Sequence, residues 1–156
     1  MKKILLLVFA LLLLASCGGK KDTIPEGYAE YAFGELRFVL PKDTYNKVEM
    51  ENFDYCLAAE DTMIAANSFT KEEVKAAGLS GEELAELVFQ GHETETLNGH
   101  RYYGYTAGSE EDQFYQIYSL VESSQYYYDV LLVCEEAVKA EKEAVLLSIL
   151  ENLRTD

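Results

Sequence analysis

The sequence predicts an α+β domain in which an antiparallel sheet packs against helices. Three observations carry this prediction: short runs of β-prone residues separated by turn residues, two capping boxes in the middle of the chain, and a closing segment whose apolar residues recur at helical spacing. Strands that gather before and after a pair of helices, without strict alternation, are typical of α+β chains.

The first half of the domain is predicted to be rich in strands. The β-prone runs cover residues 31–33, 35–40, 53–59 and 62–67. Pro41 ends the second run because proline cannot donate to a strand ladder. Glu60 and Asp61 form the turn of a predicted hairpin between the third and fourth runs. Residues 42–52 are predicted to be a loop.

Two short helices follow, and each begins with a capping box. Thr70 stands three residues before Glu73, and Ser80 stands three residues before Glu83, so each hydroxyl and carboxylate can cap the other's backbone. The second helix has an apolar stripe that we expect to lie on the sheet. This stripe is Leu84, Leu87 and Val88.

The second half is predicted to be a meander closed by a helix. Asn98-Gly99 between β-prone runs is a strong hairpin signal, and turns are expected at 108–112 and at Ser123-Ser124. The predicted strands are 94–97, 100–103, 114–121 and 126–134. A helix is expected over 137–153. Its inner stripe is Val138, Val145, Leu146, Ile149 and Leu153.

Leu14-Ala15-Ser16-Cys17 follows two lysines and an apolar run at 4–13, which is the order of a signal peptide. This segment resembles the lipobox of bacterial lipoproteins, and the resemblance implies a diacylglycerol on Cys17 after removal of residues 1–16. The alternatives are an ordinary signal peptide and an uncleaved membrane helix, which the short apolar run disfavours. Residues 17–29 are then a lipidated flexible linker, and residues 30–154 form a single domain.

The chain is strongly acidic, with 28 acidic and 13 basic residues and a net charge of −15. Removal of Lys2 and Lys3 with the signal peptide takes the charge to −17. Phosphate backbones and anionic headgroups repel such a surface, so we expect no nucleic-acid partner and a membrane contact only through lipid.

Cys56 and Cys134 are the two cysteines that remain once Cys17 carries lipid. An even pair in an exported chain can form a disulfide if the strands that hold the two residues are neighbours. Two buried free thiols are the alternative, because free cysteine is among the most buried residue types.

Three short motifs resemble the PsbP and Mog1 fold family. They are Phe38-Val39-Leu40-Pro41, Leu97-Asn98-Gly99-His100-Arg101-Tyr102-Tyr103 and Ile149-Leu150-Glu151-Asn152-Leu153. The resemblance covers most of residues 31–154 and implies an α/β/α sandwich used for binding and for assembly of larger complexes. No functional residue is carried over, because no motif of this chain matches one.

No catalytic motif or metal motif is recognised. His92 and His100 are the only histidines, and the register set by Asn98-Gly99 places them about 16 Å apart along their strands, too far for one ion. No serine lies in a nucleophile elbow. We therefore expect no metal, no cofactor and no enzymatic activity.

Tyrosine is unusually frequent, with 12 in the chain and eight between positions 102 and 128. Strand alternation predicts that Tyr126 and Tyr128 share one face and that Tyr127 takes the other. One set is expected to pack under helices, and the other can present an aromatic binding surface or simply stabilise the sheet. The candidate surface residues are Tyr102, Tyr103, Tyr115, Tyr118, Tyr126 and Tyr128. Asp129 lies in an apolar run and is the first polar residue to examine for burial or pairing.

These features predict a lipid-anchored, non-enzymatic domain on the extracytoplasmic face of the cell membrane. The expected role is to bind a surface protein or to help assemble a complex, although no motif names that partner. A lipoprotein that captures a small ligand is the second hypothesis, and a surface hydrolase is the third.

Overall fold

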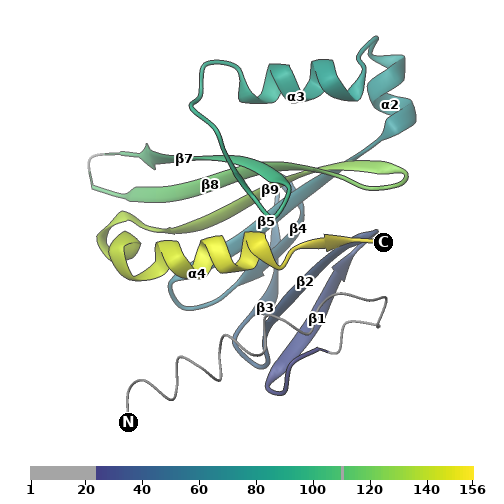
Figure 1. The fold of residues 1–156 in the computed structure, drawn as a ribbon. Helices are drawn as coiled ribbons and strands as arrows, with labels where there is room; N and C mark the ends of the chain where they lie inside the picture. Colours follow the sequence, from purple (N-terminus) through teal and green to yellow (C-terminus); the bar gives the residue numbers. More distant parts are fainter. Residues whose placement is uncertain (1–23, 110) are drawn as a thin grey trace, which may run out of the picture.

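The structure is a computed structural model that describes residues 24–109 and 111–156, and two antiparallel sheets with three α-helices make up its regular elements (Figure 1). The small sheet contains β1 (Tyr28–Phe33), β2 (Leu36–Pro41) and β10 (Arg154–Thr155). The main sheet contains β3 (Asn46–Met50), β4 (Phe53–Ala58), β5 (Thr62–Thr70), β6 (Glu95–Leu97), β7 (His100–Gly108), β8 (Gln113–Glu122) and β9 (Tyr126–Glu135). The helices are α2 (Lys71–Ala76), α3 (Gly81–Phe89) and α4 (Lys139–Glu151), and the 3₁₀ turn η1 (Glu136–Val138) precedes α4. Cys17, the predicted signal peptide and most of the predicted linker lie outside the described residues.

The strands of the main sheet follow the order β3-β4-β5-β9-β8-β7-β6. The chain leaves β5 through α2 and α3, enters the far edge of the sheet at β6, and returns as a meander until β9 pairs with β5. All of these pairings are antiparallel. The central strand pair of the sheet, β5 and β9, therefore joins two segments that are about 60 residues apart in sequence.

The core lies between one face of the main sheet and a layer formed by α4 and the small sheet. Helices α2 and α3 lie on the other side of the main sheet (Figure 1). The fully buried side chains of the core include Leu36, Phe38, Leu40, Leu57, Ile64, Ile117, Tyr128, Val130, Leu132, Leu146 and Leu150. The α+β prediction, with an antiparallel sheet packed between helices, is confirmed.

Two strands were not expected from the sequence. Residues 42–52 contain β3, which pairs with β4 through an irregular register at Val48 and Met50. Strand β10 pairs with only Arg37 and Leu36 of β2. Strand β1 begins at Tyr28, inside the segment predicted to be a linker. Such pairings depend on a partner strand and leave little local signal.

The predicted apolar stripe of α3 is wrong at one position. Leu87 is 61% exposed, whereas Phe89 is 4% exposed and packs against the main sheet. Gly81 also faces the sheet, because a Cβ there would meet the Tyr127 hydroxyl. The stripe that meets the sheet is thus rotated away from Leu87. In α4, Val145 is likewise exposed, and Leu150 takes a buried position that was not predicted.

Both capping boxes are confirmed. The Thr70 hydroxyl accepts from the Glu73 backbone N–H at 3.1 Å, and the Glu73 carboxylate accepts from the Thr70 backbone at 2.8 Å. Ser80 and Glu83 repeat this arrangement at 3.2 and 2.8 Å. In each box the backbone hydrogen bond lowers the pKa of the glutamate.

We expect Thr70→Ala and Ser80→Ala each to lower the free energy of unfolding by about 1 kcal/mol, because each leaves helix-end N–H groups without their acceptor. Urea unfolding of the three proteins measures the change. Ser148→Ala, on the exposed side of α4, is the matched control and should cost nothing, since alanine favours a helix interior. Equal losses in all three variants would contradict the capping explanation.

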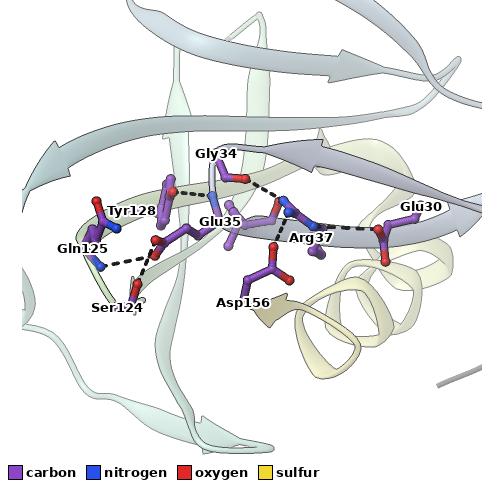
Figure 2. Close-up of polar contacts among 9 residues, drawn as sticks. Glu30, Gly34, Glu35, Arg37, Ser124, Gln125, Tyr128 and Asp156 are labelled. Atoms are coloured by element: carbon purple, nitrogen blue, oxygen red, sulfur yellow. Dashed lines mark hydrogen bonds and ion pairs between the residues drawn. The ribbon is translucent and has the colours of Figure 1, made fainter. Parts of the chain in front are cut away.

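The two sheets are joined by a polar clamp at the β1–β2 turn (Figure 2). The Tyr128 hydroxyl of β9 accepts from the Glu35 backbone N–H at 2.8 Å, and the Glu35 carboxylate accepts from the Ser124 hydroxyl at 2.7 Å. Arg37 contacts the carboxylates of Asp156 and Glu30. This clamp ties the small sheet to the β8–β9 turn and to the last residue of the chain.

Cys56 and Cys134 are both buried free thiols, so the disulfide alternative is wrong for this fold. Cys56 lies on β4 and Cys134 on β9, and β5 lies between these strands. The register also places the two side chains on opposite faces, since Cys134 belongs to the core whereas Cys56 is opposite Ala65. A disulfide requires Cα atoms within about 7 Å, which these positions do not allow.

Within the two described ranges, no helix combines the length and the apolar character that crossing a membrane requires.

Candidate functional site

The tyrosines do not form one surface, because the register divides them between the two faces of the main sheet. Four of the six predicted surface residues lie on the core face, where Tyr102, Tyr115 and Tyr128 are buried and Tyr126 is partly buried. The prediction of a shared surface is wrong for these four. Their hydroxyls still find acceptors or donors, as when Tyr115 donates to Glu143 at 2.6 Å.

The triplet Tyr126-Tyr127-Tyr128 alternates as predicted, but neither set is free. Tyr127 points to the face opposite the core and is only 8% exposed. Its ring is covered by the α2–α3 pair, with the hydroxyl against Gly81 and the Lys71 ammonium 5.5 Å from the ring centroid. The triplet therefore stabilises the sheet and its covering helices.

On the other face of β7, β8, β9 and β5, beyond the end that α3 covers, most side chains are half-buried, whereas Ala65 and Val133 are buried. Every second side chain of a strand lies on the same face, and the cross-strand register shows which side chains of neighbouring strands share that face. We call this surface the open face. It consists of Met63, Asn67, Tyr103, Tyr105, Gln116, Tyr118, Asp129 and Leu131.

An aromatic cluster forms one side of the open face. The exposed imidazole of His92 stacks on Tyr103 with 3.9 Å between ring centroids, and Tyr103 lies 5.4 Å from Tyr105 and 5.5 Å from Tyr118. Phe89 of α3 meets the edge of the Tyr103 ring at 6.0 Å. We call His92, Tyr103, Tyr105 and Tyr118 the aromatic cluster. These separations are typical of attractive ring contacts, so the cluster is held in a defined arrangement.

Asp129 lies beside this cluster. It is directly opposite Leu120 on β8, and Tyr118 is its diagonal neighbour, at a separation of about 7 Å for such pairs. Its carboxylate accepts from the Asn67 backbone N–H at 2.8 Å and from the Asn67 amide at 3.4 Å. Burial is the main cause that raises the pKa of Asp129, and the charge of Asp54 adds to it.

The neighbouring tyrosine hydroxyls stay protonated at neutral pH and therefore do not act as bases. Burial and then the charge of Asp129 raise the pKa of Tyr118 far above neutral pH. Burial also raises the pKa values of Tyr103 and Tyr105. Tyr105 donates to the Gln116 side chain at 2.7 Å. At neutral pH the open face therefore offers neutral phenol rings and one carboxyl group that is costly to ionise.

Elsewhere in the described residues, the chain covers its aromatic rings with its own cations. Lysines lie over Tyr55, Tyr127 and Tyr115, and Arg101 lies 4.5 Å from the Phe89 ring. None of these contacts, within residues 24–109 and 111–156, involves a ring of the aromatic cluster. The ion pairs found in the same ranges likewise do not include Asp129.

A cavity of about 370 Å³ lies between α3 and the main sheet, beside the open face. Phe89, Arg101 and Tyr127 are among its lining residues. A second hollow of about 510 Å³ lies at the α2–α3 turn, between Lys71, Lys75 and Tyr127. Both volumes are within the size range of small-molecule sites.

The histidines occupy separate places. Leu97 pairs with His100 and Thr96 with Arg101, as the hairpin predicts, but β6 begins only at Glu95 and does not reach His92. His100 instead hydrogen-bonds the Leu153 carbonyl at 3.1 Å. In the part of the chain that the structure describes, no three His, Cys, Asp or Glu side chains are grouped as metal ligands.

Sequence reasoning found Tyr103, Tyr118 and Asp129 but missed the other members of the site. The alternation of side chains along a strand could have identified Tyr105, since it follows Tyr103 by two residues on the same strand. His92 and Asn67 had no local signal, because their positions depend on how α3 returns over the sheet and on the β5–β9 pairing.

Fold and site together define an α+β domain that carries a partly exposed aromatic face beside a half-buried carboxylate. Among solved structures, a protein from Bacteroides thetaiotaomicron VPI-5482 is similar, with a TM-score of 0.52, 13% identity, and a match that covers 78% of this chain and 45% of that chain. Cyanobacterial PsbP (CyanoP) from Synechocystis sp. PCC 6803 also matches, with a TM-score of 0.46, 12% identity, and coverage of 92% and 99%.

The likeness to the Bacteroides protein concerns the fold alone, and this chain spans less than half the length of that protein. A PsbP, a member of the family that three motifs of the sequence resemble, is thus among the matching structures. No family model matches the chain, and no curated protein matches it.

Proposed function

We propose that this chain is a lipid-anchored, non-catalytic domain on the extracytoplasmic face of the cell membrane, and that its open face binds a protein partner. The observation that carries the proposal is the aromatic cluster, which is ordered by ring stacking and still partly exposed. Rigid tyrosine side chains supply contact area at little entropic cost and are enriched at protein interfaces.

The chemistry of the open face favours binding over catalysis. Its phenols are protonated at neutral pH, as tyrosines ordinarily are, and burial raises their pKa values further. The carboxyl group of Asp129 is engaged by Asn67 on both oxygens. Such groups serve as contact points and hydrogen-bond partners. The His92 ring adds to the same surface by stacking on Tyr103.

Crosslinking from intact cells tests the partner. A photoreactive residue in place of Tyr105 should capture a specific protein. The same residue in place of Tyr28, which is 41% exposed on β1, is the control and should capture none. A captured protein that is lost on Tyr103→Ala supports the proposal. Recovery of lipid alone from position 105, or the same protein from both positions, would reject it.

The membrane anchor has its own test. We expect Cys17→Ala to abolish lipid labelling and to leave the signal peptide uncleaved, because the thiol is the acceptor that the lipobox implies. Metabolic labelling with a fatty acid, followed by mass determination of the chain, measures both effects. Cys56→Ala is the control and should be labelled like the natural chain. Unchanged labelling in Cys17→Ala would remove the anchor from the proposal.

Capture of a small ligand is the second candidate function, and the cavity of about 370 Å³ under α3 favours it. Ala85→Leu would fill this cavity without touching the aromatic cluster. Under the protein-binding proposal, this variant still crosslinks its partner from position 105. Loss of a co-purifying small molecule in Ala85→Leu, with no protein captured, would favour ligand capture.

A further inference from the structure

We propose that the open face is a receptor for an arginine side chain of a basic protein partner, with Asp129 as the counter-ion and the aromatic cluster as the stacking surface. This inference rests on the proposed function and names the chemistry of the partner. The contacts of Asp129, the cations that the chain places elsewhere and the overall charge support it.

The carboxylate of Asp129 can pair with a cation, and none of the ion pairs in the described part of the chain supplies one. Asn67 occupies one position on each carboxylate oxygen, so each oxygen of this open-face residue can still accept a further hydrogen bond. Arg101, two residues from Tyr103 on β7, is held by Glu86 at 3.2 Å and by the Phe89 ring. A half-buried carboxylate without a cation is costly, and an incoming guanidinium would remove that cost.

The rings of the aromatic cluster are the second half of the receptor. At four other places in the described chain, a lysine or arginine lies 4.0–5.5 Å from an aromatic centroid, so this protein uses that contact repeatedly. Tyr105 and Tyr118 present comparable rings with no cation among those contacts. Guanidinium groups stack on aromatic faces and bind carboxylates with two parallel hydrogen bonds, which an ammonium cannot reproduce.

Charge complementarity identifies the kind of partner. The chain carries a net charge of −15, so a basic segment is attracted from a distance and an acidic one is repelled. This long-range attraction is unspecific, whereas the pairing of Asp129 with the cluster selects one side chain. A buried arginine between aromatic rings is also the kind of contact that dominates interface energies.

The test measures binding of a short glycine–serine peptide with one central arginine to the full chain purified in detergent. The same peptide with citrulline, which keeps the shape and loses the charge, is the control ligand. Shifts of the tyrosine ring resonances report the contact. We expect the arginine peptide to bind and to move the rings of Tyr103, Tyr105 and Tyr118, and the citrulline peptide to bind at least tenfold more weakly.

Three variants distinguish specific arginine binding at the open face from general electrostatic attraction to the acidic chain. Asp129→Asn and Tyr105→Leu should each weaken arginine binding by about tenfold. Glu49→Gln removes the same charge from exposed β3 and should change binding less than twofold. Tyrosine ring resonances of each variant without peptide, compared with those of the natural chain, show that the face is intact. Equal losses in Asp129→Asn and Glu49→Gln would overturn the receptor.

The outcomes for the two proposals are distinguishable. If position 105 captures a protein but the arginine and citrulline peptides bind alike, the open face is a protein site and the arginine receptor is wrong. If the arginine peptide binds as expected but no protein is captured from intact cells, the receptor stands and the protein-binding proposal fails.

Discussion

Phe38→Ala is expected to lower the free energy of unfolding by about 3–5 kcal/mol, because it removes the largest fully buried side chain that the small sheet contributes to the core. Phe38 is fully buried and its ring stacks on Tyr55 of β4, with 6.3 Å between centroids. The substitution leaves a cavity at the contact between the two sheets. Since domains of this size are stable by about 5–15 kcal/mol, a large part of the total is lost.

Chemical denaturation with urea measures this loss, and Val39→Ala is the matched control. Val39 is the next residue on β2 and its side chain points away from the core, so we expect at most about 1 kcal/mol. Comparable losses in the two variants would contradict the assignment of Phe38 to the sheet–sheet contact. A first unfolding step confined to the small sheet would show that this sheet detaches independently.

Gly34→Ala is expected to cost about 2–4 kcal/mol, from two sources that can be separated. Gly34 has a φ of 58°, where a side chain costs about 1–2 kcal/mol. A Cβ at this position would also lie 2.5 Å from the Tyr128 hydroxyl. The ring must then move, and the hydrogen bond from the Glu35 N–H is weakened, which adds about 1–3 kcal/mol.

A double-mutant cycle with Tyr128→Phe isolates the contact. Tyr128→Phe alone should cost about 1–3 kcal/mol because the Glu35 N–H loses its acceptor. In the Tyr128→Phe background, Gly34→Ala should cost only the backbone term, because the hydroxyl that it meets is gone. Strict additivity of the two changes would show that the glycine and the hydroxyl are not coupled.

Gly27→Ala is the control for the backbone term. Gly27 has a φ of 83°, and a Cβ there would meet no atom within 4 Å. Its replacement should therefore cost about 1–2 kcal/mol and show no coupling to Tyr128→Phe. A loss as large as that of Gly34→Ala would assign the whole effect to backbone strain.

Elements that depend on neighbours in sequence were predictable. Both capping boxes form because the hydroxyl and the glutamate are three residues apart on one turn of helix. The Asn98-Gly99 hairpin forms because both residues adopt positive φ, at 47° and 86°. The alternation within the tyrosine triplet follows from the period of a strand.

Elements that depend on distant partners were not predictable. Strand β10 exists because β2, near the start of the described chain, pairs with it. The exposure of Leu87 reflects how α3 is placed over the sheet. Cys56 and Cys134 lie in strands that the sequence places 78 positions apart, and only the insertion of β5 between them decides that they cannot bond. Local propensity contains no information on these distances.

The candidate site shows the same division. Strand period alone determined that Tyr103 and Tyr105 share a face and that Tyr102 takes the other. Only the tertiary structure decided which face became the core, because α4 and the small sheet pack on the side of Tyr102, Tyr115 and Tyr128. The sequence by itself therefore determined the fold class, the helix starts and the alternation of side chains. Long-range packing decided which tyrosines were buried and which were left beside Asp129, since burial is a property of the surfaces that meet and not of one strand.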